Sequence, residues 1–242
     1  MTADFGDLKF GIPSAIGKAD LRLGDCLDIL RTLPDDSVDL VITDPPYVFD
    51  NLTEGGWARG KKVGKYVEEL SSLSEGMNFE VLDECLRVLK KTNLYIWGNW
   101  QCIKDYMAYF QDKDVKSNLL TWHKANPPPL CGNGYLKDTE YCLFVREEGV
   151  KLYGGYKDLG TYWVTPLNTK DKERYGHPTV KPLEIIRQMV RNSTDGGGDA
   201  VVLDPYMGSG TTGSACMLEG RRFIGCEINP EYYATAKRRL GL

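Results

Sequence analysis

Short hydrophobic runs that alternate with amphipathic stretches are the feature that most limits the folds open to this chain. Strands buried on both faces read as continuous hydrophobic runs, whereas the helices that join parallel strands bury one side only. The helical spacing is clearest in Leu183, Ile186, Met189 and Val190. The alternation predicts an α/β fold with a mostly parallel, seven-stranded sheet and helices on both faces. The predicted strands are residues 21–23, 38–43, 94–97, 119–123, 141–145, 200–203 and 222–226. The fourth and fifth can pair as an antiparallel hairpin at one edge.

Composition narrows the class of protein. The 242 residues suit one large domain or two small ones, and 42% of them are hydrophobic, which is enough to fill a core. The seven cysteines include no Cys-x-x-Cys pair and the two histidines stand far apart, so we expect no metal site and a reducing cytoplasm. No leader or membrane segment is expected. A net charge of -4 disfavours a surface that coats nucleic acid throughout but allows a local basic patch.

A glycine loop lies between the predicted strand 200–203 and the helix that follows it. Gly208 and Gly210 let the backbone approach a ligand and offer its N–H groups. Thr212 stands where a dinucleotide fingerprint has its third glycine, so pyrophosphate binding is not supported. Glu227 ends the next strand, where a carboxylate can accept hydrogen bonds from both hydroxyls of a ribose. Ribose without pyrophosphate points to S-adenosylmethionine; the alternative is a tight turn without a ligand.

The tetrapeptide Asp44-Pro45-Pro46-Tyr47 directly follows the predicted strand 38–43. It therefore stands at the carboxyl end of a central strand, where open α/β sheets have their ligand crevice. The prolines lack N–H donors, so the Asp44 carboxylate and the Pro45 carbonyl form a pair of hydrogen-bond acceptors. Such a pair favours a pyramidal, nucleophilic nitrogen in an aromatic amine, and Tyr47 offers a ring for stacking. The tetrapeptide predicts methyl transfer to an exocyclic amine, although alone it also fits a proline turn.

With both loops, the chain resembles the amino-methyltransferases of DNA, in the permuted subgroup called β, in which the catalytic half precedes the cofactor half. The resemblance spans nearly the whole chain and implies a single domain with a Rossmann-like methyltransferase fold. It implies a catalytic half at residues 1–125, a target-recognition region at 126–176 and a cofactor-binding half at 177–242. The implied cofactor is S-adenosylmethionine, and the implied partner is double-stranded DNA with the target base flipped out.

The first residue of the tetrapeptide bears on the target base. In the resembling family, Asp at this place favours N6 of adenine, whereas Ser is commoner in enzymes that methylate N4 of cytosine. We therefore expect a site-specific DNA adenine-N6 methyltransferase. The alternatives are an N4-cytosine enzyme, a non-catalytic nucleic-acid-binding subunit that keeps the fold, and a nicotinamide-dependent oxidoreductase, which the missing third glycine disfavours. The short recognition region suggests a short target sequence, or help from a second subunit in a homodimer.

The resemblance also assigns the remaining site residues. Trp122 and Lys124 are candidates for contact with the base or a phosphate, although Trp122 fits a core position as well. By charge alone, Arg59, Lys61, Lys62 and Lys65 concentrate positive charge after the tetrapeptide and can neutralise phosphates, or belong to a solvated loop. Residues 24–26 are expected near the adenine ring and residues 177–182 near the methionine end, with an ordinary helix start as the alternative for each. The residues predicted to bind the cofactor are Asp25, Cys26, His177, Thr179, Lys181, Asp204, Pro205, Tyr206, Met207, Gly208, Ser209, Gly210, Thr211, Thr212, Glu227 and Ile228.

Overall fold

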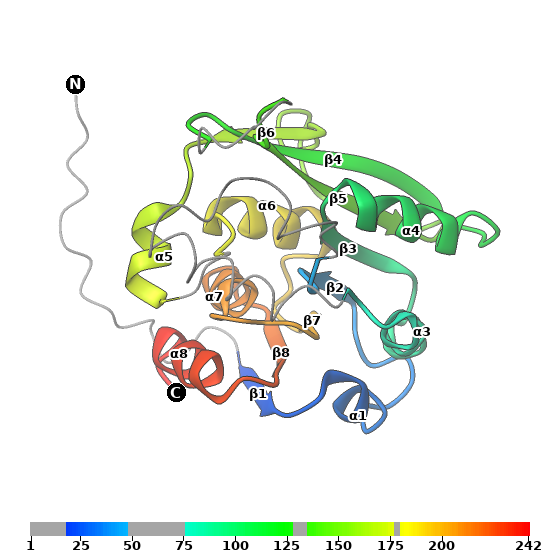
Figure 1. Cartoon of the computed structure of the whole chain (residues 1–242). Coiled ribbons are helices and arrows are strands. Elements are labelled where there is room, and N and C mark those ends of the chain that lie inside the picture. Colours follow the sequence, from blue (N-terminus) through cyan, green and yellow to red (C-terminus); the bar gives the residue numbers. More distant parts are fainter. Residues whose placement is uncertain (1–17, 48–75, 128–134, 177–179) are drawn as a thin grey trace.

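A single mixed sheet organises the chain. The computed structural model describes residues 18–47, 76–127, 135–176 and 180–242. Within them the sheet has the order β1-β8-β7-β2-β3-β5-β4-β6, and helices cover both faces (Figure 1). The strands are β1 (Ala19–Leu23), β2 (Leu40–Thr43), β3 (Asn93–Gly98), β4 (Lys116–Lys124), β5 (Thr139–Arg146), β6 (Tyr162–Thr165), β7 (Val201–Asp204) and β8 (Arg222–Glu227). The helices are α1 (Cys26–Leu30), α3 (Phe79–Val88), α4 (Trp100–Phe110), α5 (Thr169–Tyr175), α6 (Leu183–Ser193), α7 (Thr211–Leu218) and α8 (Pro230–Leu240).

The sheet confirms the predicted α/β class and differs from the prediction at one edge. Neighbouring strands pair parallel except at β5, which runs antiparallel to both β3 and β4. The predicted count of seven strands is corrected to eight, because β6 falls in residues 147–176, where the sequence has no clean periodicity. Since β6 pairs with β4, the predicted hairpin of β4 and β5 lies one strand in from the edge.

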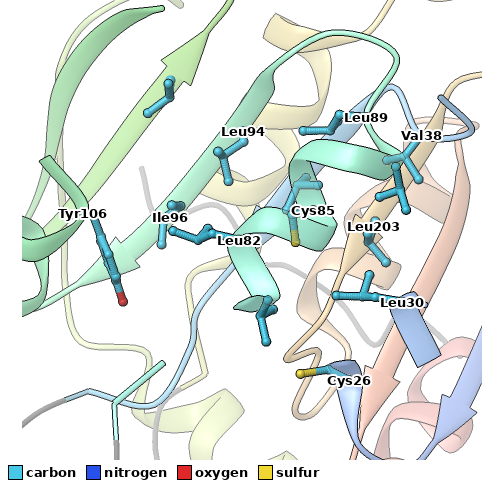
Figure 2. Close-up of a cluster of buried hydrophobic side chains, with 14 of the residues drawn as sticks. Cys26, Leu30, Val38, Leu82, Cys85, Leu89, Leu94, Ile96, Tyr106 and Leu203 are labelled. Carbon is cyan, nitrogen blue, oxygen red and sulfur yellow. The ribbon is translucent and has the colours of Figure 1, made fainter. Parts of the chain in front are cut away.

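Each face of the sheet has its own hydrophobic core, because successive side chains of a strand point to opposite faces. In β3, Leu94 and Ile96 belong to the core covered by α1, α3 and α4, part of which Figure 2 shows. Tyr95 and Trp97 belong to the core covered by α6, α7 and α8. These four side chains are buried, so β3 lies in the middle of three layers.

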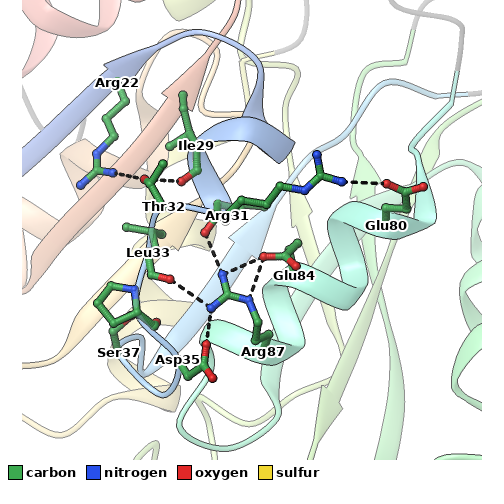
Figure 3. A network of polar contacts seen from close by, with 12 residues as sticks. Arg22, Ile29, Arg31, Thr32, Leu33, Asp35, Ser37, Glu80, Glu84 and Arg87 are labelled. Atoms are coloured by element: carbon green, nitrogen blue, oxygen red, sulfur yellow. Dashed lines mark hydrogen bonds and ion pairs between the residues drawn. The ribbon is translucent and has the colours of Figure 1, made fainter.

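A polar network ties α1 to α3 beside the start of β2 (Figure 3). Arg87 of α3 donates to the carbonyls of Leu30 (2.9 Å) and Leu33 (3.0 Å). The same guanidinium pairs with Glu84 and Asp35. Because its guanidinium bonds carbonyls at the end of α1 and in the turn after it, Arg87 holds the turn that leads into β2.

The other predictions on composition concern thiols, metals and membranes. In the described part of the chain, six cysteines are buried free thiols: Cys26, Cys85, Cys102, Cys142, Cys216 and Cys226. Over the same residues, no three His, Cys, Asp or Glu side chains are grouped to hold a metal ion. None of the helices described is long and apolar enough to cross a membrane.

Candidate active site

Two neighbouring strand ends form the centre of the site. β2 and β7 pair parallel, with Val41 opposite Leu203. Parallel pairing brings their carboxyl ends to the same edge of the sheet. Asp44 directly follows β2 and Asp204 ends β7, so the two carboxylates stand at adjacent strand ends. This arrangement confirms the prediction that the strands ending at Asp44 and Asp204 lie side by side.

The glycine loop turns the chain from β7 into α7. Gly208 and Gly210 have φ angles of 51° and 79°, in the left-handed region that favours glycine. A Cβ atom on Gly210 would also lie 3.1 Å from the Cβ of Ala236 in α8. The backbone N–H of Met207 donates to the Cys226 carbonyl in β8 (3.0 Å). The loop is therefore held between two elements and needs glycine at Gly210 for conformation and for space.

Asp204 stabilises the glycine loop through hydrogen bonds to its carboxylate. Its carboxylate accepts hydrogen bonds from the Thr212 hydroxyl (2.6 Å) and from the backbone N–H of Tyr206 (3.1 Å). The side chain is buried, and this burial raises the pKa of Asp204 to about 7. Asp204 thus links the first residues of the loop to the first turn of α7.

Glu227 ends β8 and faces the glycine loop. Its carboxylate accepts hydrogen bonds from the backbone N–H groups of Gly208 (3.0 Å) and Asn229 (2.8 Å). Burial raises the pKa of Glu227. Each carboxylate oxygen keeps acceptor capacity for a ligand donor, as the binding of ribose hydroxyls requires.

A cavity of about 160 Å³ opens beside Glu227. Val81 and Ile228 give the cavity apolar surface next to the Glu227 carboxylate. An apolar surface for a base beside an acceptor for ribose hydroxyls suits a nucleoside. Asp25 lines the cavity and also caps α1, where its side chain accepts from the backbone N–H of Leu27 (2.8 Å). The predicted residues that line this cavity are Asp25, Cys26, Pro205, Tyr206, Glu227 and Ile228.

A larger cavity, of about 450 Å³, lies beside Asp39 and Asn93, at the amino ends of the strands. It is therefore on the side of the sheet opposite to the carboxyl ends that carry Asp44 and Asp204. Of the predicted site residues that the structure describes, none lines it. The smaller cavity is therefore the one that belongs to the candidate site, because it alone of the two adjoins the glycine loop.

Three predicted cofactor residues use their side chains inside the protein. Met207 is buried in the core on the α6–α8 side of the sheet. The hydroxyls of Ser209 and Thr211 accept hydrogen bonds from Arg239 of α8, at 3.2 and 2.9 Å. Contacts of these three residues with a cofactor would therefore involve the backbone.

Donors from the protein itself surround the Asp44 carboxylate. Its Oδ1 accepts from the Tyr47 hydroxyl (2.7 Å) and its Oδ2 from Lys181 Nζ (2.5 Å). Burial raises the pKa of Asp44, although Lys181 opposes this shift. Lys181 is 6% exposed and precedes α6, so the fold joins it to a carboxylate 137 positions away. The residue predicted near the methionine end of the cofactor contacts the acceptor carboxylate directly.

Glu140 of β5 is a member of the site that the sequence analysis did not identify. Its carboxylate pairs with Lys181 (3.1 Å) and with Lys124 of β4 (2.7 Å). Burial acts to raise the pKa of Glu140, but the two lysines outweigh burial and lower the pKa to about 2. A carboxylate directly before the predicted strand 141–145 was the available signal, yet its partners follow only from how β4 and β5 pair.

Trp122 is corrected from a predicted DNA contact to a core residue. Its side chain is buried, and its indole N–H donates to the Thr165 hydroxyl of β6 (2.8 Å). The alternative interpretation of Trp122 as core is right, because β6 pairs with β4 at this position. Lys124 is committed to Glu140 and lies 5.4 Å from the centroid of the Trp122 ring. The predicted residues that lie outside the described ranges are Arg59, Lys61, Lys62, Lys65, His177 and Thr179.

The fold is that of an α/β methyltransferase, in which the Asp44 loop and the glycine loop follow adjacent parallel strands. A family model described as DNA methylase matches residues 38–238. The chain belongs to this DNA methylase family.

Named relatives agree with this membership. The Type II methyltransferase M2.DpnII of Streptococcus pneumoniae is 31% identical over 89% of this chain and 87% of its own length. The DNA adenine methyltransferase YhdJ of Escherichia coli K12 is 31% identical over 90% of this chain and 81% of its own length. The crystal structure of the M1.HpyAVI–SAM complex matches with a TM-score of 0.69 at 25% identity, over 93% of this chain and 100% of that one.

Proposed function

We propose that this protein transfers a methyl group from S-adenosylmethionine to the N6 amino group of adenine in DNA. The observation that carries the proposal is the position of Asp44-Pro45-Pro46-Tyr47 beside the glycine loop, at the ends of paired strands. The kinship with an adenine methyltransferase of DNA supports the choice of base. Two substrates bound at adjacent strand ends react at close quarters, which accounts for much of the expected acceleration.

The cofactor is proposed to occupy the cavity beside Glu227. Glu227 would accept hydrogen bonds from the ribose hydroxyls, and the apolar surface of Val81 and Ile228 would contact the adenine ring. The backbone N–H groups of the glycine loop would donate hydrogen bonds to the remaining part of the cofactor. When bound, S-adenosylmethionine supplies an electrophilic methyl group on a sulfonium ion.

The tetrapeptide is proposed to prepare the acceptor nitrogen. The lone pair of an exocyclic amine is delocalised into the base, so the nitrogen is a poor nucleophile. Hydrogen bonds from its two N–H groups to the Asp44 carboxylate and the Pro45 carbonyl would favour a pyramidal nitrogen with a localised lone pair. Tyr47 lies next to these acceptors and would stack on the base.

A base inside a duplex cannot reach Asp44, so the target adenine must leave the helix. We propose that double-stranded DNA binds with this base flipped out and that Arg59, Lys61 and Lys62 neutralise phosphates nearby. Residues 126–176 would form the recognition region between a catalytic half (1–125) and a cofactor half (177–242). A second copy of the chain in a homodimer would extend this short region. We propose that it acts in the cytoplasm, which fits a methylase of genomic DNA.

The product identifies the function directly. Purified protein is incubated with methyl-labelled S-adenosylmethionine and unmethylated DNA, and the DNA is then digested to nucleosides. The proposal predicts label in N6-methyladenine. Label in N4-methylcytosine would support the alternative base, and label only in RNA or in protein glutamine would refute a DNA substrate. A protein that binds DNA and transfers no label would be a non-catalytic subunit.

A further inference from the structure

Both oxygens of the Asp44 carboxylate already accept a donor from the protein in this arrangement. One oxygen bonds the Tyr47 hydroxyl and the other bonds Lys181 Nζ. In the proposed function, the same carboxylate must accept a hydrogen bond from the target amino group. The arriving amino group therefore competes with the present donors for the lone pairs of this carboxylate.

Lys181 has an alternative partner in Glu140. Its ammonium carries three N–H donors and contacts Glu140 at 3.1 Å as well as Asp44 at 2.5 Å. The Tyr47 hydroxyl is itself 3.1 Å from Lys181 Nζ, so it belongs to the same cluster. Lys181 is buried, and a buried ammonium that left Asp44 without another carboxylate nearby would carry a large desolvation cost.

Glu140 is held in place to receive Lys181. It stands on β5 opposite Trp122 of β4, and Lys124, two residues further along β4, binds its other carboxylate oxygen at 2.7 Å. The four ionised side chains Asp44, Glu140, Lys124 and Lys181 have no net charge, and they alternate in sign along the chain of contacts. A shift of Lys181 toward Glu140 keeps every charge paired.

We propose that Glu140 is a positioning residue that competes with Asp44 for Lys181, so that Lys181 releases Asp44 when the target amino group arrives. The inference rests on the proposed function, since it assumes an amino group at Asp44. Glu140 itself does not contact the base. Without its carboxylate, Lys181 stays on Asp44 and competes with the substrate.

The charges around Asp44 make this role measurable as a pH dependence. Lys181 lowers the pKa of Asp44, whereas Glu140 raises it. Within the described residues, Lys124 pairs with Glu140, and Lys172 and Asp204 are further titratable groups close to this cluster. Tyr47, Tyr106 and Cys142 also face it, and burial raises the pKa of each, so all three stay neutral. Removing the Glu140 charge should therefore lower the pKa of Asp44.

The test compares Glu140→Gln with wild type and with the control Glu147→Gln. Glu147 follows β5, lies 4.0 Å from Lys91 and is 44% exposed, so the same substitution is made outside the cluster. Methyl transfer to unmethylated DNA is measured as kcat/KM from about pH 5 to about pH 9, which reports ionisations of the free enzyme. Affinity for S-adenosylmethionine is measured by calorimetry.

We expect Glu140→Gln to reduce kcat/KM at the optimum by about 10- to 100-fold, the range of a hydrogen bond to a charged group. Its acidic limb should move to lower pH, because Asp44 stays ionised further into acid, while cofactor affinity stays unchanged. Glu147→Gln should match wild type in all three. Since a merely structural defect would lower activity without this shift of the acidic limb, the shift separates positioning from damage.

Wild-type kcat/KM and an unshifted acidic limb in Glu140→Gln would overturn the inference. If this variant does not fold, the double variant Lys124→Met/Glu140→Gln keeps the cluster neutral and should show the same loss, with a smaller shift of the acidic limb in the same direction, because removal of Lys124 offsets part of it. Wild-type protein without transfer to DNA would instead refute the proposed function, so the two failures are distinguishable.

Discussion

Asp204 should make the stability of the protein depend on pH in an unusual direction. Its carboxylate is buried, accepts hydrogen bonds from Thr212 and Tyr206, and has a pKa raised from 3.8 to about 7 by burial. Between these two values the folded protein binds a proton at Asp204 that the unfolded chain does not bind. Stability from this group therefore rises as pH falls from about 7 toward about 4.

The magnitude follows from the pKa difference. One pKa unit corresponds to about 1.4 kcal/mol, and the shift at Asp204 spans about three units, so the full contribution is about 4 kcal/mol. Asp204→Asn is neutral at every pH and resembles the protonated carboxyl in shape and hydrogen bonding. The variant should lose this dependence, and above pH 7 it should be the more stable of the two proteins.

Urea unfolding across the range from about pH 4 to about pH 8 measures this difference. The free energy of unfolding of wild type minus that of Asp204→Asn should fall by several kcal/mol as pH rises. Asp28→Asn serves as a control, because the Asp28 side chain is 80% exposed. A wild-type curve parallel to that of Asp204→Asn throughout would refute the reasoning, since burial would then not disfavour the charge.

Two further predictions concern the cofactor half. Gly210→Ala should destabilise the fold by about 2–5 kcal/mol, from a strained positive φ and a Cβ pressed against Ala236, whereas Gly149→Ala, with φ of 84° and only the tip of Lys91 nearby, should cost about 1–2 kcal/mol. Denaturant midpoints compare the two, and equal losses would contradict the packing argument. Glu227→Gln should weaken the affinity for S-adenosylmethionine by roughly 10- to 100-fold. Calorimetry measures it, and unchanged affinity would place the ribose elsewhere.

The central site could be predicted because short sequence patterns mark its position. A hydrophobic run that stops at Asp44-Pro45-Pro46, and another that stops at a glycine loop, both mark carboxyl ends of buried strands. Adjacent parallel pairing of β2 and β7 then brings these ends together. Proline and glycine constrain the backbone within a few residues. The strand ends and loops that they mark can therefore be predicted without knowledge of tertiary contacts.

The side of the site that faces β4 could not be predicted in the same way. β6 has only four residues, alternates between exposed and half-buried, and lies in a segment rich in Gly, Tyr and Lys. Without β6, the sequence could not decide between a core position and a DNA contact for Trp122. Glu140 joins the site only through the pairing of β4 with β5 and through its ion pair with Lys181, which is distant in sequence. These contacts depend on which strands become neighbours and on residues far apart in the sequence, and local patterns do not show either.

Asp44→Ala tests the account most directly. Transfer of labelled methyl groups to unmethylated DNA and calorimetric binding of S-adenosylmethionine are measured on the same preparations of wild type and variant. The account predicts that wild type forms N6-methyladenine, and that Asp44→Ala loses transfer by about 100-fold or more while it binds the cofactor with wild-type affinity. Undiminished transfer by Asp44→Ala would contradict the central claim, because the methyl acceptor would then not be held by Asp44.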